Sequence, residues 1–188
     1  MGVPSKEERV LELFLNEPSK HFHFSQIVET AKVSEPSASK WLKKLLKEKI
    51  IQRVKLKGKM PYFIGNFSHD NYRNKKKVYA LQKLYESGLL AKLQSLKNAK
   101  TIVIFGSFAR SDWNSGSDVD IFVLGDPEDL RFGILWSGLG LQGKARELQV
   151  HSYKSVEETR NIHSGLMKNV IKGYFVKGNI FDIAEVET

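Results

Sequence analysis

The sequence predicts an α+β protein built from two modules: a basic helical module that ends in a strand hairpin, and an α/β module with a small mixed sheet. Three observations support this fold class. Residues 1–77 hold 17 Lys and Arg against 8 Asp and Glu, whereas residues 78–188 hold 13 of each. Amphipathic helical segments followed by a hairpin pattern occupy the basic part. A buried strand that opens into a Gly-Ser turn occupies the neutral part.

Length and composition exclude several classes of protein. A chain of 188 residues, 41% of them hydrophobic, is long enough for two small domains with packed cores. It contains no cysteine, which excludes disulfides, a thiolate nucleophile and a cysteine-based zinc site. No apolar run approaches the roughly 18 residues of a membrane span, and the N-terminus lacks a signal-peptide pattern. We therefore expect a soluble, cytoplasmic protein with no membrane partner.

The first two helices are predicted from apolar residues at helical spacing. One covers residues 6–16 and is closed by Pro18. After a strand-like stretch at residues 20–24, Ser25 is the expected N-cap of the second helix. The buried side of this second helix is expected to consist of Ile27, Val28 and Ala31.

The third helix is predicted over residues 35–49, after a tight turn at Lys32-Val33 and an N-cap at Ser34. Its apolar stripe consists of Ala38, Trp41, Leu42 and Leu45. Its other faces carry the hydroxyl and ammonium groups of Ser37, Ser39, Lys40, Lys43, Lys44 and Lys47. A helix of this kind suits the major groove, because lysines neutralise phosphates while polar residues reach base edges.

A hairpin with a basic tip follows over residues 50–64, and Pro61 marks its returning strand as an edge. It adds four cations to the basic face, Arg53, Lys55, Lys57 and Lys59. The order of helices and hairpin over residues 5–65 resembles the winged helix-turn-helix family of transcriptional regulators. The resemblance implies that the third helix and the hairpin bind nucleic acid, most simply double-stranded DNA. We place this domain at residues 1–66.

Residues 67–97 are predicted to form a helical connector. A first helix over residues 71–87 would end at Gly88, and a second would cover residues 89–97. Apolar residues on or near one side of the first helix are Tyr72, Val78, Leu81, Leu84 and Tyr85, and the run Lys75-Lys76-Lys77 is expected to be exposed. We interpret this run as a solvated face, with a second nucleic-acid contact as the alternative.

The second domain, residues 98–188, contains two short motifs that point to phosphate chemistry. A buried strand at residues 101–105 is followed at once by Gly106-Ser107, whose backbone N–H groups and hydroxyl can cradle phosphates. Asp118 and Asp120 lie two residues apart on the next strand, so their carboxylates project from one face. Mg²⁺ takes one or two protein carboxylates and completes its octahedron with water and phosphate oxygens.

These motifs resemble the polymerase-beta-like nucleotidyltransferase superfamily, in particular its minimal nucleotidyltransferases, over roughly residues 90–188. The resemblance implies transfer of a nucleoside monophosphate from ATP or another nucleoside triphosphate to an acceptor, with release of pyrophosphate. It implies that Asp118 and Asp120 are catalytic and bind Mg²⁺, in a site for one or two ions. The residues that it assigns to nucleotide binding are Gly106, Ser107, Arg110 and Ser117.

Two residues of the loop between these motifs have alternative interpretations. Arg110 can neutralise charge that develops on the phosphates, or it can pin the loop through a carboxylate such as Asp112. Trp113 is interpreted as a packing residue, with stacking on a base as the alternative.

The sequence departs from the superfamily at the third carboxylate, which the related enzymes place on the next strand. That strand is predicted over residues 147–153, with Leu148 and Val150 inward, and the expected acid is replaced by Gln149. An amide cannot take the proton of the attacking hydroxyl. Glu147 could substitute if the register slips by two residues, or His151 could act as the base.

The remaining segments are predicted as two short helices over residues 155–164 and 166–172, followed by a terminal hairpin over residues 174–181.

Two hypotheses follow. In the first, the protein is a Mg²⁺-dependent nucleotidyltransferase that its winged helix brings to a nucleic acid or another partner. In the second, it is a DNA-binding regulator whose transferase fold senses nucleotide or supports a homodimer. Ser107, Asp118 and Asp120 favour the enzyme, and Gln149 favours the regulator. On balance we favour the enzyme.

Overall fold

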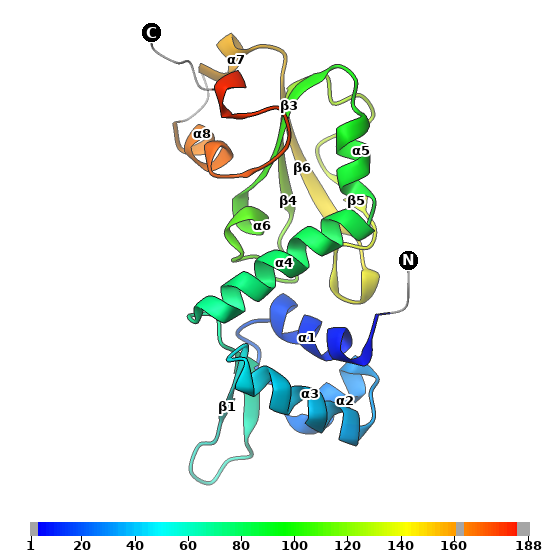
Figure 1. The fold of residues 1–188 in the computed structure, drawn as a ribbon, viewed down its shortest axis with the longest axis vertical. Helices are drawn as coiled ribbons and strands as arrows, with labels where there is room; N and C mark the ends of the chain where they lie inside the picture. The colour runs from blue at the N-terminus through cyan, green and yellow to red at the C-terminus, as the bar shows by residue number, and fades with distance from the viewer. Residues whose placement is uncertain (1–3, 161–163, 184–188) are drawn as a thin grey trace. The chain divides into compact units, whose positions relative to one another are not determined.

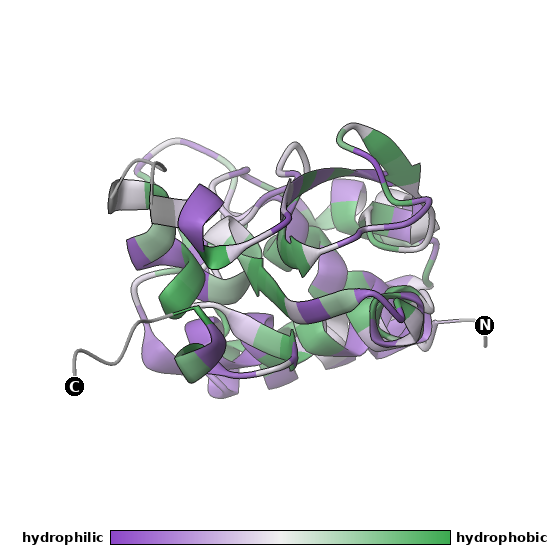
Figure 2. Cartoon of the chain, turned by 90° about the horizontal axis from the view of Figure 1, so that it is seen from above, coloured by the Kyte–Doolittle hydropathy of each residue, from purple (hydrophilic) through white to green (hydrophobic). Residues whose placement is uncertain are grey.

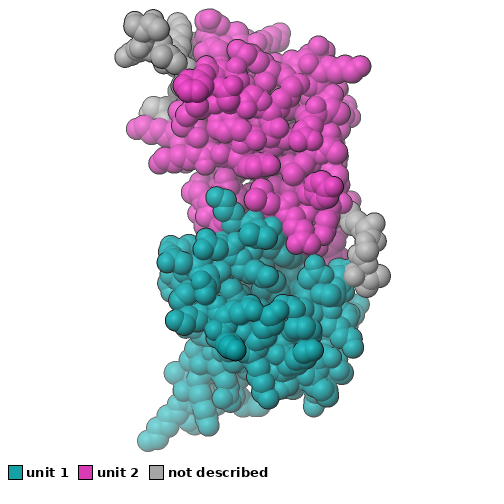
Figure 3. All heavy atoms as spheres, viewed as in Figure 1, with its two compact units in different colours: residues 1–79 teal, residues 80–188 magenta. Residues whose placement is uncertain are grey.

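The structure is a computed structural model that describes residues 4–160 and 164–183. It divides into two compact units, Met1–Tyr79 and Ala80–Thr188, and the division falls within helix α4, Asp70–Glu86 (Figures 1 and 3). Within the described ranges, no helix is both long enough and apolar enough to cross a membrane.

Three helices begin the first unit: α1 (Lys6–Asn16), α2 (Phe24–Ala31) and α3 (Glu35–Lys47). The predicted helix over residues 6–16 is confirmed, and a capping box starts it: Ser5 Oγ accepts from the Glu8 N–H at 3.1 Å, and Glu8 accepts from the Ser5 N–H at 2.7 Å. The predicted N-cap of α2 is wrong. The cap is His23, whose N–H donates to the side chain of Gln26 at 2.9 Å, so the helix begins one residue before Ser25.

Helix α3 buries the predicted stripe only in part. Ala38, Leu42 and Leu45 are buried, whereas Trp41 is half-buried, with the ammonium groups of Lys40 and Lys44 at 4.6 and 5.5 Å from its ring centroid. Similarly, α2 buries Ile27 and Ala31 but leaves Val28 half-buried. Hydrophobic and hydrophilic residues are interspersed along the helices and strands of the chain (Figure 2).

The predicted hairpin is confirmed as β1 (Ile51–Val54) and β2 (Tyr62–Gly65), which pair antiparallel with Arg53 opposite Phe63. The strand-like stretch at residues 20–24 is reduced to a single bridge, in which Phe22 and Phe63 exchange two backbone hydrogen bonds of 2.8 and 2.9 Å. Leu56 lies beyond the end of β1 and is 48% exposed.

Helix α4 corrects the predicted solvated lysine run. Lys76 is only 1% exposed, and its ammonium lies 5.5 Å from the centroid of the Tyr72 ring. Tyr72, Lys76 and Tyr79 follow one another at spacings of four and three, so they share the buried face of the helix. The Tyr72 hydroxyl donates to the carbonyl of Phe14 at 2.9 Å. Val78 and Tyr85, predicted on or near the apolar side, are 61% and 75% exposed.

The second unit is built on a five-stranded sheet in the order β5-β6-β4-β3-β7. Its strands are β3 (Ala99–Phe105), β4 (Val119–Gly125), β5 (Ile134–Trp136), β6 (Arg146–Tyr153) and β7 (Tyr174–Lys177). Only the β4–β6 pair is parallel, so the predicted small mixed sheet is confirmed. The central strands β3 and β4 are almost wholly buried, which explains their continuous apolar sequence.

Short helices surround this sheet (Figure 1). They are α5 (Leu89–Ser95), α6 (Gly106–Arg110), α7 (Val156–Arg160) and α8 (Ser164–Ile171), with 3₁₀ turns at Leu141–Gly143 and Ile180–Asp182. One core cluster joins β3, β4 and α8 through Val103, Phe105, Phe122, Leu124 and Val170, together with Ile183. The predicted helices over residues 155–164 and 166–172 are confirmed in the described part, and residues 161–163 lie outside it.

Two features of the second unit differ from the prediction. The terminal hairpin does not form: β7 pairs with the central strand β3, and after the turn at Gly178 the chain enters a 3₁₀ turn. Strand β5 was not predicted, because three residues give too short a pattern to recognise.

Candidate active site

The Gly-Ser turn lies where β3 ends against β4. Gly106 has φ +68°, a conformation that glycine adopts readily. A Cβ on this residue would overlap the carboxylate of Asp120. Phe105, at the end of β3, is the sheet partner of Asp120. A glycine is therefore required here both by its backbone conformation and by the close approach of the Asp120 side chain.

The two aspartates lie in different environments. Asp118 precedes β4 and is exposed, whereas Asp120 is half-buried within the strand. Burial raises the pKa of the Asp120 carboxyl above its ordinary value. Positive charge on His151 and Arg110 lowers this pKa, while the carboxylate of Asp118 raises it. The sheet thus brings a solvated and a desolvated carboxylate together, as predicted from their spacing.

Gln149 occupies the position expected for the third carboxylate. It is the parallel sheet partner of Asp120, so the register does not slip and Glu147 does not take its place. The Gln149 Nε2 group donates to Glu147 Oε1 at 2.6 Å and to Asp118 Oδ2 at 3.3 Å. Its Oε1 is buried and has no hydrogen-bond partner among the described residues. Gln149 therefore links two acids and leaves one neutral oxygen unsatisfied.

His151 lies two residues further along β6, between two aromatic rings. Its centroid is 5.7 Å from that of Phe105 and 5.8 Å from that of Phe132, which is 64% exposed. The aromatic residue Phe132 was not identified from the sequence, since it lies in a loop with no recognisable pattern.

Arg110 and Trp113 both serve the loop that joins the two motifs. Arg110 Nε donates to Asp112 Oδ2 at 3.0 Å. This contact agrees with the interpretation in which Arg110 holds the loop through a carboxylate. Trp113 is 1% exposed and stacks on Phe108 at 5.2 Å, so it packs the loop and presents no face to a base.

Sequence reasoning missed Arg146, which holds the same loop from β6. This buried guanidinium donates to the carbonyls of Asn114 at 2.7 Å and Ser117 at 2.6 Å, and to that of Leu139 at 3.1 Å. It also lies 5.2 and 5.3 Å from the ring centroids of Phe108 and Trp113. No spacing or motif marks this position in the sequence, because its partners are backbone carbonyls distant along the chain.

The two predicted serines are used differently. Ser117 Oγ accepts from the Asn114 N–H at 2.9 Å, so its hydroxyl helps to close the turn before Asp118. Ser107 is half-buried in the first turn of α6, directly after Gly106. The Ser107 carbonyl accepts the Asp112 N–H at 3.2 Å.

The donor set fits one Mg²⁺ and lacks a third acid. Among the described residues, no group of three or more His, Cys, Asp or Glu is arranged to hold a metal ion. Asp118 and Asp120 nevertheless supply two carboxylates, and Gln149, the sheet partner of Asp120, has a buried Oε1 with no hydrogen-bond partner among the described residues. Mg²⁺ accepts such a partial set of oxygen ligands when substrate phosphates and water complete its coordination.

The predicted nucleic-acid-binding residues lie on α3 and the β1–β2 hairpin of the first unit. The cations are exposed and the two serines half-exposed: Ser37, Ser39, Lys40, Lys43, Lys44, Lys47, Arg53, Lys55, Lys57 and Lys59. Lys44 differs from the rest because it binds Glu7 at 2.7 Å, and this hydrogen bond raises the pKa of its ammonium.

Comparison with protein families assigns the second unit to a class. Residues 87–178 match the family model described as the nucleotidyltransferase domain, a range that begins before α5 and ends after β7. The chain therefore contains a nucleotidyltransferase domain, and Gly106, Ser107, Asp118 and Asp120 all lie within it. Neither the search of curated proteins nor the search of solved structures gave a significant match.

Proposed function

We propose that the protein is a nucleotidyltransferase that moves a nucleoside monophosphate from a nucleoside triphosphate to a hydroxyl of an acceptor. The observation that carries this proposal is the pairing of Asp118 and Asp120 against the obligatory Gly106 turn, inside the matched nucleotidyltransferase domain. Gly106 and Ser107 would cradle the phosphates through backbone N–H groups and the hydroxyl. Arg110 would add positive charge beside them.

In this reaction the acceptor oxygen bonds to the α-phosphorus while the bond from that phosphorus to the bridging oxygen breaks. Pyrophosphate takes the electron pair of the broken bond, and the acceptor hydroxyl releases its proton to solvent water. A Mg²⁺ held by Asp118 and Asp120 would neutralise phosphate charge and lower the pKa of the attacking hydroxyl. The partial burial of Asp120 keeps its charge poorly solvated, which strengthens its attraction for a cation.

Removal of the acceptor proton is the weak step of this site. Gln149 cannot accept a proton, and it lies where the third carboxylate is expected. Glu147 is separated from Asp118 by the Gln149 amide, and His151 lies beside Asp120 among aromatic rings. We therefore propose slow transfer, with nucleotide binding less affected than turnover.

The first unit supports a nucleic-acid-binding role. Its order of three helices and a hairpin resembles that of a winged helix, and α3 and the hairpin carry all ten predicted contact residues. Lysines on these two elements would bind phosphates of double-stranded DNA. Binding would bring the transferase domain to a nucleic acid or to a partner bound there.

A second candidate function is favoured by Gln149. In this alternative the protein is a DNA-binding regulator, and its second unit binds a nucleoside triphosphate without transferring the nucleotide. The missing acid and the unsatisfied Gln149 Oε1 support a site that binds more readily than it reacts.

Calorimetric titration of ATP, then of the other nucleoside triphosphates, with Mg²⁺ tests the shared part of both candidates. We expect binding that requires Mg²⁺ and is lost in an Asp118→Ala, Asp120→Ala variant. Asp126→Ala is the matched control, since this exposed acid follows the opposite end of β4 and should leave binding intact. Absence of binding in the wild-type protein contradicts both candidates. Transfer of an α-phosphate label to an acceptor then separates the enzyme from the regulator.

A further inference from the structure

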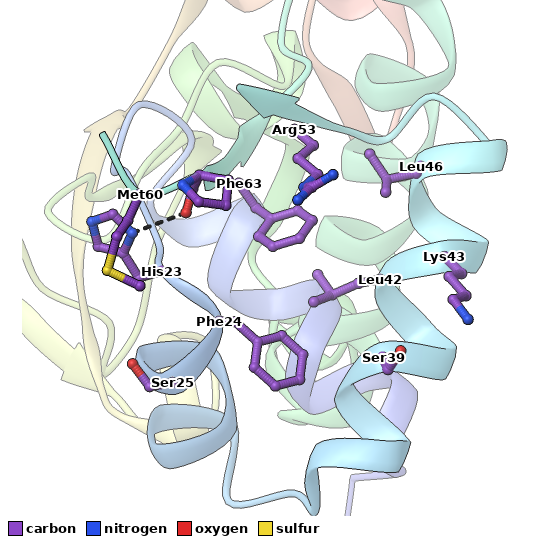
Figure 4. A pocket seen from close by; sticks show the side chains of 11 residues that line it. His23, Phe24, Ser25, Ser39, Leu42, Lys43, Leu46, Arg53, Met60 and Phe63 are labelled. Atoms are coloured by element: carbon purple, nitrogen blue, oxygen red, sulfur yellow. Dashed lines mark hydrogen bonds between the residues drawn. The ribbon is translucent and has the colours of Figure 1, made fainter. Parts of the chain in front are cut away.

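We propose that the first unit contains a binding site for an amphipathic monocarboxylate, in the pocket between α2, α3 and the β1–β2 hairpin (Figure 4). The pocket has a volume of about 500 Å³, which lies within the roughly 300–1,000 Å³ of small-molecule sites. The eleven residues that line it fall between His23 and Phe63 in the sequence, so none is assigned to nucleotide chemistry, although Ser39, Lys43 and Arg53 are also predicted nucleic-acid contacts. The inference therefore stands independently of the proposed transferase.

The walls of the pocket are mainly apolar. Phe24 from α2, Leu42 and Leu46 from α3, and Met60 and Phe63 from the hairpin surround it (Figure 4). Phe24 is 36% exposed and Met60 is 75% exposed, so part of this apolar surface faces solvent. A ligand with a hydrocarbon body would remove this surface from water, which is favourable in proportion to the apolar area buried.

The charge of the residues that line the pocket determines the sign of the ligand's charge. Arg53 from β1 and Lys43 from α3 line the pocket, with the Lys43 ammonium turned away from its apolar walls (Figure 4). The register of the hairpin fixes Arg53 opposite Phe63. No Asp or Glu is among the lining residues, and within residues 4–160 and 164–183 neither cation forms an ion pair. The ligand is therefore an anion.

The combination of an apolar cavity and one well-placed guanidinium selects a monocarboxylate. The planar fork of Arg53 matches the two oxygens of a carboxylate in a bidentate hydrogen bond. The hydroxyls of Ser25 and Ser39 lie at the sides of the pocket and can accept or donate further bonds (Figure 4). A nucleotide or a nucleic-acid backbone carries several charges and would leave the apolar walls exposed, whereas a medium-length fatty acid or an aromatic acid fills them.

Calorimetric titration of octanoate and 1-octanol into the full chain, without Mg²⁺ or nucleotide, tests this site. The two probes share a hydrocarbon body and differ in charge. We expect octanoate to bind at one site per chain and more tightly than octanol. Arg53→Gln should weaken octanoate binding at least tenfold and leave octanol binding unchanged. Lys55→Gln is the matched control, because this exposed hairpin cation does not line the pocket.

A second variant tests the position of the ligand. Met60→Glu places a carboxylate at the exposed edge of the pocket and should weaken octanoate more than octanol. Both substituted side chains are exposed, so circular dichroism should show unchanged folding. Lack of saturable octanoate binding at millimolar concentration overturns the proposal. Binding that Arg53→Gln and Met60→Glu both leave unchanged, or equal binding of the two probes, overturns it as well.

Discussion

The two units differ in how their proposed functional residues are arranged. In the second unit, the proposed chemistry depends on a few side chains held at fixed positions by the sheet, such as Asp120 against Gly106. In the first unit, the proposed nucleic-acid contact is spread over exposed cations on one helix and one hairpin. A site of the first kind should fail when one residue changes, whereas a surface of the second kind should weaken in steps.

The largest effect is expected for Gly106→Ala. The new Cβ would overlap the Asp120 carboxylate, and the left-handed backbone would add strain of roughly 1–3 kcal/mol. We expect Mg²⁺-dependent binding of nucleoside triphosphate to be lost in calorimetry. Gly116→Ala is the matched control: its nearest non-neighbouring atom lies 3.5 Å from the added Cβ, an ordinary contact, so binding should persist. Equal nucleotide binding by Gly106→Ala and Gly116→Ala would show that the Gly106 turn is not a fixed part of the binding site.

The next effect concerns the missing acid. Gln149→Asp introduces a carboxylate beside Asp120 and should increase transfer of an α-phosphate label by about 10²-fold, the scale of general acid–base catalysis. The new charge also raises the pKa of Asp120 further. The increase in transfer should therefore appear at a higher pH than the ordinary pKa of a carboxylate would suggest. Glu147→Gln is the comparison variant, because among the described residues its carboxylate accepts one hydrogen bond, from the Gln149 amide at 2.6 Å. If Gln149→Asp leaves transfer undetectable while nucleotide still binds, the regulator is favoured.

A smaller effect is expected at Arg146, which supports the site without being part of it. Arg146→Lys keeps the charge but loses the fork that donates to the carbonyls of Asn114, Ser117 and Leu139. The free energy of unfolding should fall by about 2 kcal/mol, the scale of a hydrogen bond to a charged group. Urea denaturation measures this change, and Arg131→Lys, at an exposed position, should change stability by less than about 0.5 kcal/mol. A loss of stability in Arg131→Lys as large as that in Arg146→Lys would contradict the role of Arg146 in holding the loop.

The residues that could be predicted are those whose roles follow from neighbours in the sequence. The continuous apolar runs located β3 and β4, and the spacing of Asp118 and Asp120 placed both acids at one site. The register that aligns Gln149 with Asp120 was also anticipated, because burial of Leu148 and Val150 fixes which residues of β6 face the acids.

The residues that could not be predicted depend on contacts distant along the chain. Lys76 is buried with its ammonium near the Tyr72 ring, although a run of lysines usually indicates a solvated surface. Strand β7 joins β3 because the sheet has an open edge there, and no local pattern records which edge a strand will pair with. The pocket of the first unit is likewise made by three elements that the sequence separates.

The smallest effects are expected from single lysines on α3, and they test whether the first unit is a distributed surface. Lys40→Gln and Lys43→Gln should each reduce DNA affinity several-fold without abolishing binding. Each should lower the slope of log affinity against log salt by about 0.9, since one phosphate contact releases about one counterion. Fluorescence anisotropy of a labelled duplex across a salt series measures both quantities, with Lys97→Gln, exposed in the second unit, as the control.

Because Lys44 is held by Glu7, its replacement should change the slope less than that of Lys40 or Lys43. An unchanged slope in all three α3 variants would show that this helix does not contact phosphates. Complete loss of binding from any one of them would show instead that the first unit, like the second, depends on single fixed side chains.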